Sequence, residues 1–133
     1  MMRRKIMFAA SLALVSITAF AGYRQPVPVE VDLDNQFALG DMLTAATDKS
    51  DLASIGCGTR SVPDGVGGIY TFGFCQAQDA TGVYCDCFTE NADLIQAIRG
   101  ISDYSFISFG WDVDGNCTRI GISTQSFYLD KPK

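Results

Sequence analysis

The chain has 133 residues, with 15 acidic side chains against 10 basic ones, five cysteines and no histidine. The lack of histidine excludes Ser-His-Asp and Cys-His nucleophile activation and histidine-based zinc catalysis. Because the excess negative charge repels phosphate backbones and anionic lipids, we expect neither nucleic acid nor a membrane surface among the partners.

The first 21 residues have the pattern of a secretory signal peptide. Basic residues at positions 3–5 precede an apolar run from Ile6 to Phe20, and Ala19-Phe20-Ala21 offers a small-x-small cleavage site. The run is shorter than the roughly 20 apolar residues needed to cross a bilayer. We therefore predict cleavage after Ala21 and a secreted or periplasmic mature protein, with no membrane contact after cleavage.

Cleavage would leave 112 of the 133 residues, which is close to the commonest size of a single domain. The mature part keeps all 15 acidic residues but only seven of the ten basic ones, so its net charge is −8. We divide the precursor into a signal peptide at 1–21, an N-terminal arm with the first strand or helix at 22–51, and a disulfide-bearing α+β core at 52–133.

The first mature segments leave alternatives open. Apolar residues alternate over 27–33, which suits a strand, and the prolines at 26 and 28 restrict such a strand to a sheet edge; a mobile arm is the alternative. Segment 37–46 fits both a short helix and a strand poorly. Further on, 55–58 indicates a short apolar strand, and the segment 63–68, rich in proline and glycine, indicates a loop.

A β-hairpin is predicted between positions 69 and 88. The stretches 69–77 and 83–88 are rich in β-branched and aromatic residues, and they flank a turn that contains Gly82. A three-residue loop with glycine in the left-handed conformation is a common hairpin class, and here it pairs Asp79 with Val83.

The five cysteines all lie in the mature part, where an oxidising compartment favours two disulfides and one leftover thiol. The hairpin register places Cys75 opposite Cys87, with Cys85 on the same face. We therefore predict a bridge between Cys75 and Cys87 and, by elimination, one between Cys57 and Cys117. The Cys85 thiol is then either buried and inert or free to join two copies of the chain. Pairings in which Cys85 has a partner and Cys87 is spare remain open.

The C-terminal part predicts a helix and a second hairpin. Asn91 can cap a helix that runs through Ile101 and has one apolar stripe. Strands at 104–111 and 117–129 flank the turn at 112–116. The whole pattern predicts the α+β class, with about five to six strands in antiparallel hairpins packed against one amphipathic helix and tied by disulfides.

Two short motifs raise the question of chemistry. Cys85-Asp86-Cys87 lacks the spacing and the helix start of redox motifs. Asp112, Asp114 and Asn116 place oxygens at alternate positions, as in the first half of an EF-hand loop, but the turn glycine and the bidentate glutamate of that loop are replaced. A hairpin turn explains the same residues. We expect no catalytic residue, no cofactor and no metal, with calcium at these three residues as the alternative.

The aromatic residues Tyr70, Phe72 and Phe74 alternate along one predicted strand. On a face that the helix leaves uncovered they would form an apolar patch suited to a partner protein; in a strand buried on both faces they would be core. We favour a non-enzymatic secreted module that binds another protein or contributes to an extracellular structure, for example an inhibitor of a secreted enzyme that uses Ser61–Gly68 as a protruding loop.

The alternative function is a small carboxylate-dependent hydrolase of cell-wall or extracellular glycans. Glycoside hydrolysis needs two carboxyl groups about 5 to 10 Å apart in a cleft, and fifteen acids offer many pairs.

Four segments together resemble a group of small exported bacterial proteins of uncharacterised function. The resemblance implies that Cys85 departs from the group's pattern, and it implies no activity. The segments are Ile55-Gly56-Cys57, the hairpin from Phe74-Cys75-Gln76-Ala77 through Cys87, the helix from Asn91 to Ile101, and Cys117-Thr118-Arg119-Ile120, and the regular cysteines are Cys57, Cys75, Cys87 and Cys117.

Overall fold

The structure is a computed structural model that describes residues 23–130. The predicted signal peptide and its cleavage site lie outside the described residues. Within those residues, no helix is long and apolar enough to cross a membrane.

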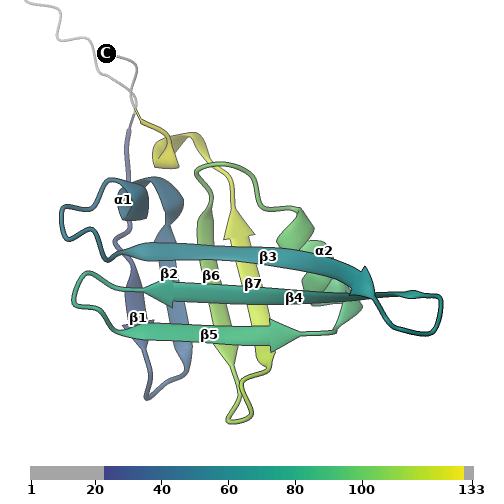
Figure 1. The fold of residues 1–133 in the computed structure, drawn as a ribbon. Coiled ribbons are helices and arrows are strands. Elements are labelled where there is room, and N and C mark those ends of the chain that lie inside the picture. Colours follow the sequence, from purple (N-terminus) through teal and green to yellow (C-terminus); the bar gives the residue numbers. More distant parts are fainter. Residues whose placement is uncertain (1–22, 131–133) are drawn as a thin grey trace, which may run out of the picture.

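Two antiparallel sheets build the fold, and their strands run crosswise to each other (Figure 1). The α+β class with disulfides is confirmed, although the structure has seven strands rather than five or six. The four-stranded sheet has the order β1-β2-β6-β7 and consists of β1 (Glu30–Asp32), β2 (Phe37–Asp41), β6 (Phe106–Trp111) and β7 (Cys117–Ser123). The three-stranded sheet consists of β3 (Ser54–Pro63), β4 (Ile69–Gln78) and β5 (Tyr84–Thr89). The helices are α1 (Met42–Ala46), α2 (Ala92–Arg99) and a 3-10 turn at Ser126–Tyr128.

The first mature segments form an edge strand, a second strand and a helix. β1 pairs only with β2, at the edge of its sheet, as the edge-strand alternative predicted. Segment 37–46 divides at Asp41 into β2 and α1. This explains why the spacing of its apolar residues fitted neither a helix nor a strand over the whole segment. The backbone amide of Asp41 donates to the Val27 carbonyl at 2.9 Å, so the proline-containing segment is held against β2.

The core lies between the two sheets, and α2 closes one end of it. Ile107 and Phe109 from one sheet and Cys75 and Ala77 from the other are fully buried there. Asn91 caps α2 as predicted, but the helix ends at Arg99, two residues earlier than expected.

A glycine lies where α2 approaches β4. An ideal Cβ at Gly73 would lie 2.6 Å from Cδ1 of Ile98, so a larger residue would require the buried Ile98 side chain to move.

Three hairpins use the same turn, with the pattern Asp-x-x-Gly-x. In each turn the aspartate amide donates to the carbonyl of the fifth residue, and its carboxylate accepts the amides of the third and fifth residues. The glycine has a positive φ, between 82° and 92°, which residues with a Cβ rarely adopt. The turns are Asp64–Gly68, Asp79–Val83 and Asp112–Asn116.

The predicted hairpin register is confirmed, but the predicted disulfide pairing is wrong. Cys75 lies opposite Cys87 in β5 and, on its other side, opposite Cys57 in β3. Antiparallel pairs alternate between wide, hydrogen-bonded and narrow, non-hydrogen-bonded geometry. Because Asp79 and Val83 form a hydrogen-bonded pair, Cys75 and Cys87 form one too, and the narrow pair of Cys75 is with Cys57.

The observed bridges are Cys57–Cys75, with Cα atoms 4.0 Å apart, and Cys87–Cys117, which joins the two sheets. The bridges predicted between Cys75 and Cys87 and between Cys57 and Cys117 are therefore not those of the structure. Cys85 is the free cysteine, and it is buried.

Candidate binding surface

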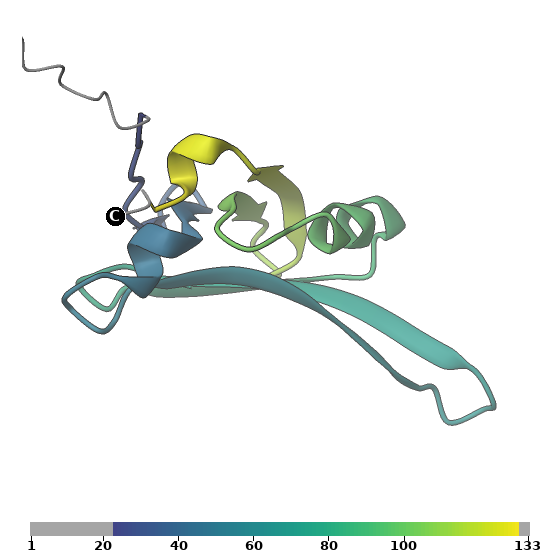
Figure 2. The ribbon, with the colours of Figure 1, turned by 90° about the horizontal axis from the view of Figure 1, so that it is seen from above.

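The hairpin of β3 and β4 extends beyond the rest of the molecule. β5 pairs with β4 only from Gly73 to Gln78, so residues 60–72 form a two-stranded extension without a third strand. Figures 1 and 2 show this extension, the projecting hairpin, reaching past α2 and curving away from the four-stranded sheet. The protruding loop predicted at Ser61–Gly68 lies at its end.

The tip of the projecting hairpin is an ordered turn with apolar side chains in solvent. Val66 is 88% exposed and Ile69 is 69% exposed. The carboxylate of Asp64 accepts the amides of Val66 and Gly68, both at 2.9 Å, and these two hydrogen bonds lower the pKa of Asp64 below its usual value. These hydrogen bonds fix the backbone of the turn that carries the apolar tip.

An apolar surface, the aromatic face, covers the outer side of the three-stranded sheet. Figure 2 shows α2 and the four-stranded sheet together on the opposite side. The Phe72 ring lies 5.7 Å from the Tyr70 ring and 5.1 Å from the Phe88 ring, measured between centroids. The aromatic face consists of Val62, Tyr70, Phe72, Phe74 and Phe88. Across the strands, Val62 pairs with Tyr70 and Phe74 with Phe88, while Phe72 lies opposite Arg60.

The structure brings the predicted patch residues Tyr70, Phe72 and Phe74 together on this uncovered face. The sequence analysis did not assign Val62 and Phe88 to this patch. The alternation of buried and exposed residues along β5 indicates Phe88. Val62 follows once Asp64–Gly68 is taken as a hairpin turn, because that turn places Val62 opposite Tyr70.

Charged groups border the aromatic face. The Tyr70 hydroxyl donates to Glu90, and this hydrogen bond raises the pKa of Tyr70. The Tyr84 hydroxyl donates to Asp86 at 3.2 Å. The guanidinium carbon of Arg60 lies 5.3 Å from the centroid of the Phe74 ring, within the range of a cation–π interaction.

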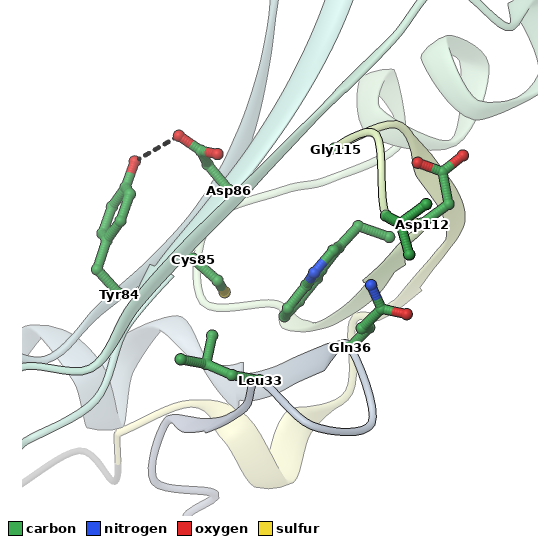
Figure 3. A pocket seen from close by; sticks show the side chains of 9 residues that line it. Leu33, Gln36, Tyr84, Cys85, Asp86, Asp112 and Gly115 are labelled. Atoms are coloured by element: carbon green, nitrogen blue, oxygen red, sulfur yellow. Dashed lines mark hydrogen bonds between the residues drawn. The ribbon is translucent and has the colours of Figure 1, made fainter.

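A shallow crevice of about 320 Å³ lies at the outer edge of β5, beside the turn between β6 and β7 (Figure 3). The Cys85 side chain points into it, toward Leu33. Burial raises the pKa of Cys85 to about 11, so the sulfur is a protonated thiol at neutral pH. This supports the inert alternative over a cross-link between chains. The crevice is lined by Leu33, Gln36, Tyr84, Cys85, Asp86, Trp111, Asp112, Val113 and Gly115.

The two carboxylates at this crevice serve other contacts. Asp86 accepts from Tyr84, and Asp112 accepts the amides of Asp114 and Asn116, both at 3.0 Å. Both carboxylates point away from the crevice in Figure 3, so they do not form the facing pair that a glycan hydrolase needs there.

The residues of the calcium alternative form the turn between β6 and β7. Asp112 uses its Oδ1 atom for the backbone of that turn, as in the other two Asp-x-x-Gly-x turns. Among residues 23–130, the cluster of potential metal ligands consists of sulfur atoms within 4.8 Å of one another, those of Cys75, Cys87 and Cys117, and all three are in disulfides.

Comparison with protein-family models, with curated proteins and with solved structures gives no match. What the projecting hairpin and the aromatic face can bind therefore has to follow from their own residues.

Proposed function

We propose that the protein is an exported, non-enzymatic module that binds another protein through the projecting hairpin. The observation that carries this proposal is an ordered turn that holds Val66 in solvent at the end of a two-stranded extension. Two disulfides tie the sheet that carries the extension, and export would keep them oxidised.

An inhibitor of an exported enzyme is the form of this function that the shape supports best. A narrow hairpin can enter a cleft that excludes a flat surface. The order of the tip reduces the conformational entropy that binding would otherwise cost. The exposed Val66 and Ile69 side chains supply apolar area for contact at the tip.

The test is affinity capture from the exported proteins of the producing cells, with the mature protein immobilised. The double variant Val66→Ser, Ile69→Ser should lose the captured protein, because it removes the apolar contact of the tip. The matched control is Val113→Ser, since Val113 is 89% exposed in the turn between β6 and β7.

The expected result is one protein retained by the wild type and by Val113→Ser but not by the tip variant. Retention of the same protein by all three forms would place the interaction elsewhere. An assay of the captured protein's enzymatic activity, with and without the module, then tests inhibition directly.

A further inference from the structure

Acidic side chains outnumber basic ones in the part of the chain that forms the aromatic face. Residues 23–130 contain five basic and fifteen acidic side chains, a net charge of −10. Arg60 is the only lysine or arginine between positions 50 and 98, and six carboxylates lie in the same stretch. On the aromatic face and its border, the carboxylates of Asp86 and Glu90 outnumber the one guanidinium of Arg60, and the net negative charge of the protein adds to their potential.

Two of these carboxylates lie beside the aromatic rings. Asp86 belongs to the outward-facing set of β5 together with Phe88, and Glu90 follows that strand and reaches Tyr70. Both residues are exposed when the face is free. A neutral apolar partner would remove water from these carboxylates without replacing it, which costs free energy.

A cationic partner replaces the lost water at the carboxylates and can also form favourable cation–π contacts with the rings. Guanidinium and ammonium groups bind aromatic faces and carboxylates together. The face itself shows the aromatic half of this pairing, because the Arg60 guanidinium lies over the Phe74 ring, and Arg60 is also the β3 residue opposite Phe72. The Phe88 ring has no lysine or arginine in its own strand or in β4.

We propose that the aromatic face binds a basic, partly apolar segment of the partner protein, with arginine or lysine side chains against Glu90 and Asp86 and over the Phe72 and Phe88 rings. This inference rests on the proposed binding function and specifies its partner by chemistry. Opposite charge also speeds association, and added salt slows it.

Three synthetic peptides test the proposal on the mature protein. Each has about eight residues, enough to follow one strand, and alternates valine with arginine, with citrulline or with glutamate. Citrulline has the shape of arginine without its charge. Binding is followed by NMR chemical shifts at Tyr70, Phe72 and Phe88, at low and at high salt.

We expect the arginine peptide to change the NMR chemical shifts of these three residues, and its affinity to fall as salt is added. The double variant Asp86→Asn, Glu90→Gln keeps the shape of both exposed side chains and should weaken binding about fivefold. The charge control Asp34→Asn, in an exposed turn outside the aromatic face, should bind as the wild type does.

The outcomes separate the inference from the function on which it rests. Equal binding of the citrulline and arginine peptides to this face would overturn the cationic partner and leave the binding function standing. Shifts spread over the acidic surface and unchanged by Asp86→Asn, Glu90→Gln would also overturn it. If no peptide shifts Tyr70, Phe72 or Phe88, the aromatic face is not a binding surface, and the partner inference fails while the capture test of the tip decides the function.

Discussion

Asp41 is the side chain on which the N-terminal segment depends. It is fully buried, and its carboxylate accepts the amides of Val27 at 2.6 Å and of Thr44 at 2.7 Å. The same carboxylate thus begins α1 and holds the segment that leads into β1. Hydrogen bonds to a buried charged acceptor are among the stronger ones in proteins.

Replacing this carboxylate should destabilise the protein strongly. Asp41→Asn keeps the size of the side chain but puts an NH₂ donor where an acceptor is needed. We expect a loss of about 2 to 4 kcal/mol in the free energy of unfolding, measured by urea denaturation. Asp34→Asn, at an exposed site, is the control, and equal stabilities of the two variants would contradict the role of Asp41.

The Cys85 thiol should react slowly in the folded protein. Its pKa of about 11 leaves far less thiolate at pH 8 than an unfolded cysteine has, with its pKa near 8.5. We expect iodoacetamide to label Cys85 at least about 100-fold more slowly in the native than in the denatured protein. Similar rates in both states, followed by mass spectrometry, would show that the thiol is accessible after all.

Single residues differ in how far the sequence indicates their roles. Asn91 was predicted as a helix cap because capping is local, and its side chain accepts the amides of Asp93 and Leu94. The role of Asp41 was not predicted, because it depends on Val27, fourteen residues away, and on the meeting of a strand with a helix.

At the scale of the elements, the Asp-x-x-Gly-x turn at Asp79 contributes stability that depends on pH. Burial alone would raise the pKa of Asp79, but hydrogen bonds from the Thr81 hydroxyl and from the amides of Val83, Thr81 and Gly82 outweigh it, so the pKa is lowered. A carboxyl whose pKa is lower in the folded state stabilises the protein above its unfolded pKa, about 3.9. This contribution is lost as the pH falls through the lower, folded value.

Asp79→Asn should therefore reduce stability at neutral pH and not at very low pH. We expect a loss of about 0.5 to 1 kcal/mol at pH 7, since the site is largely open to water. The difference from the wild type should shrink as the pH falls below about 4. Urea denaturation at several pH values measures it, and a constant difference at every pH would rule out the ionised carboxylate as the cause.

The hairpin of β4 and β5 was predicted in register because its signal is local, a glycine turn between two strand-like stretches. The pairing of β3 with β4 was not predicted, because β3 continues through the polar residues Thr59, Arg60 and Ser61, which suggest a loop. That omission caused the error in the disulfides, since it hid the second cysteine opposite Cys75.

At the scale of the whole molecule, the two disulfides differ in how accessible they are to solvent and to reducing agents. Cys57 is partly exposed, whereas Cys75, Cys87 and Cys117 are buried. A small thiol can reach the sulfur of Cys57 most easily. The crosswise packing that brings Cys87 to Cys117 joins residues 30 positions apart in different sheets, and no local pattern predicts it.

Mild reduction should therefore open the Cys57–Cys75 bridge first. Rapid alkylation and peptide mapping after partial reduction should find labelled Cys57 and Cys75 while Cys87 and Cys117 remain joined. Cys85→Ala gives the control, because it removes the free thiol that could exchange with the bridges. Labelling of Cys117 ahead of Cys57 would contradict the order expected from burial.

The gathering of three sulfurs within 4.8 Å also bears on the homogeneity of the protein. A chain oxidised only as Cys75–Cys87, with Cys57 and Cys117 left as thiols, would keep the β4–β5 register yet lose the covalent link between the sheets, and it would be heavier than the native form by only two hydrogen atoms. Two covalent forms can thus be mistaken for one, and only the native form ties the projecting hairpin's sheet to the rest of the fold.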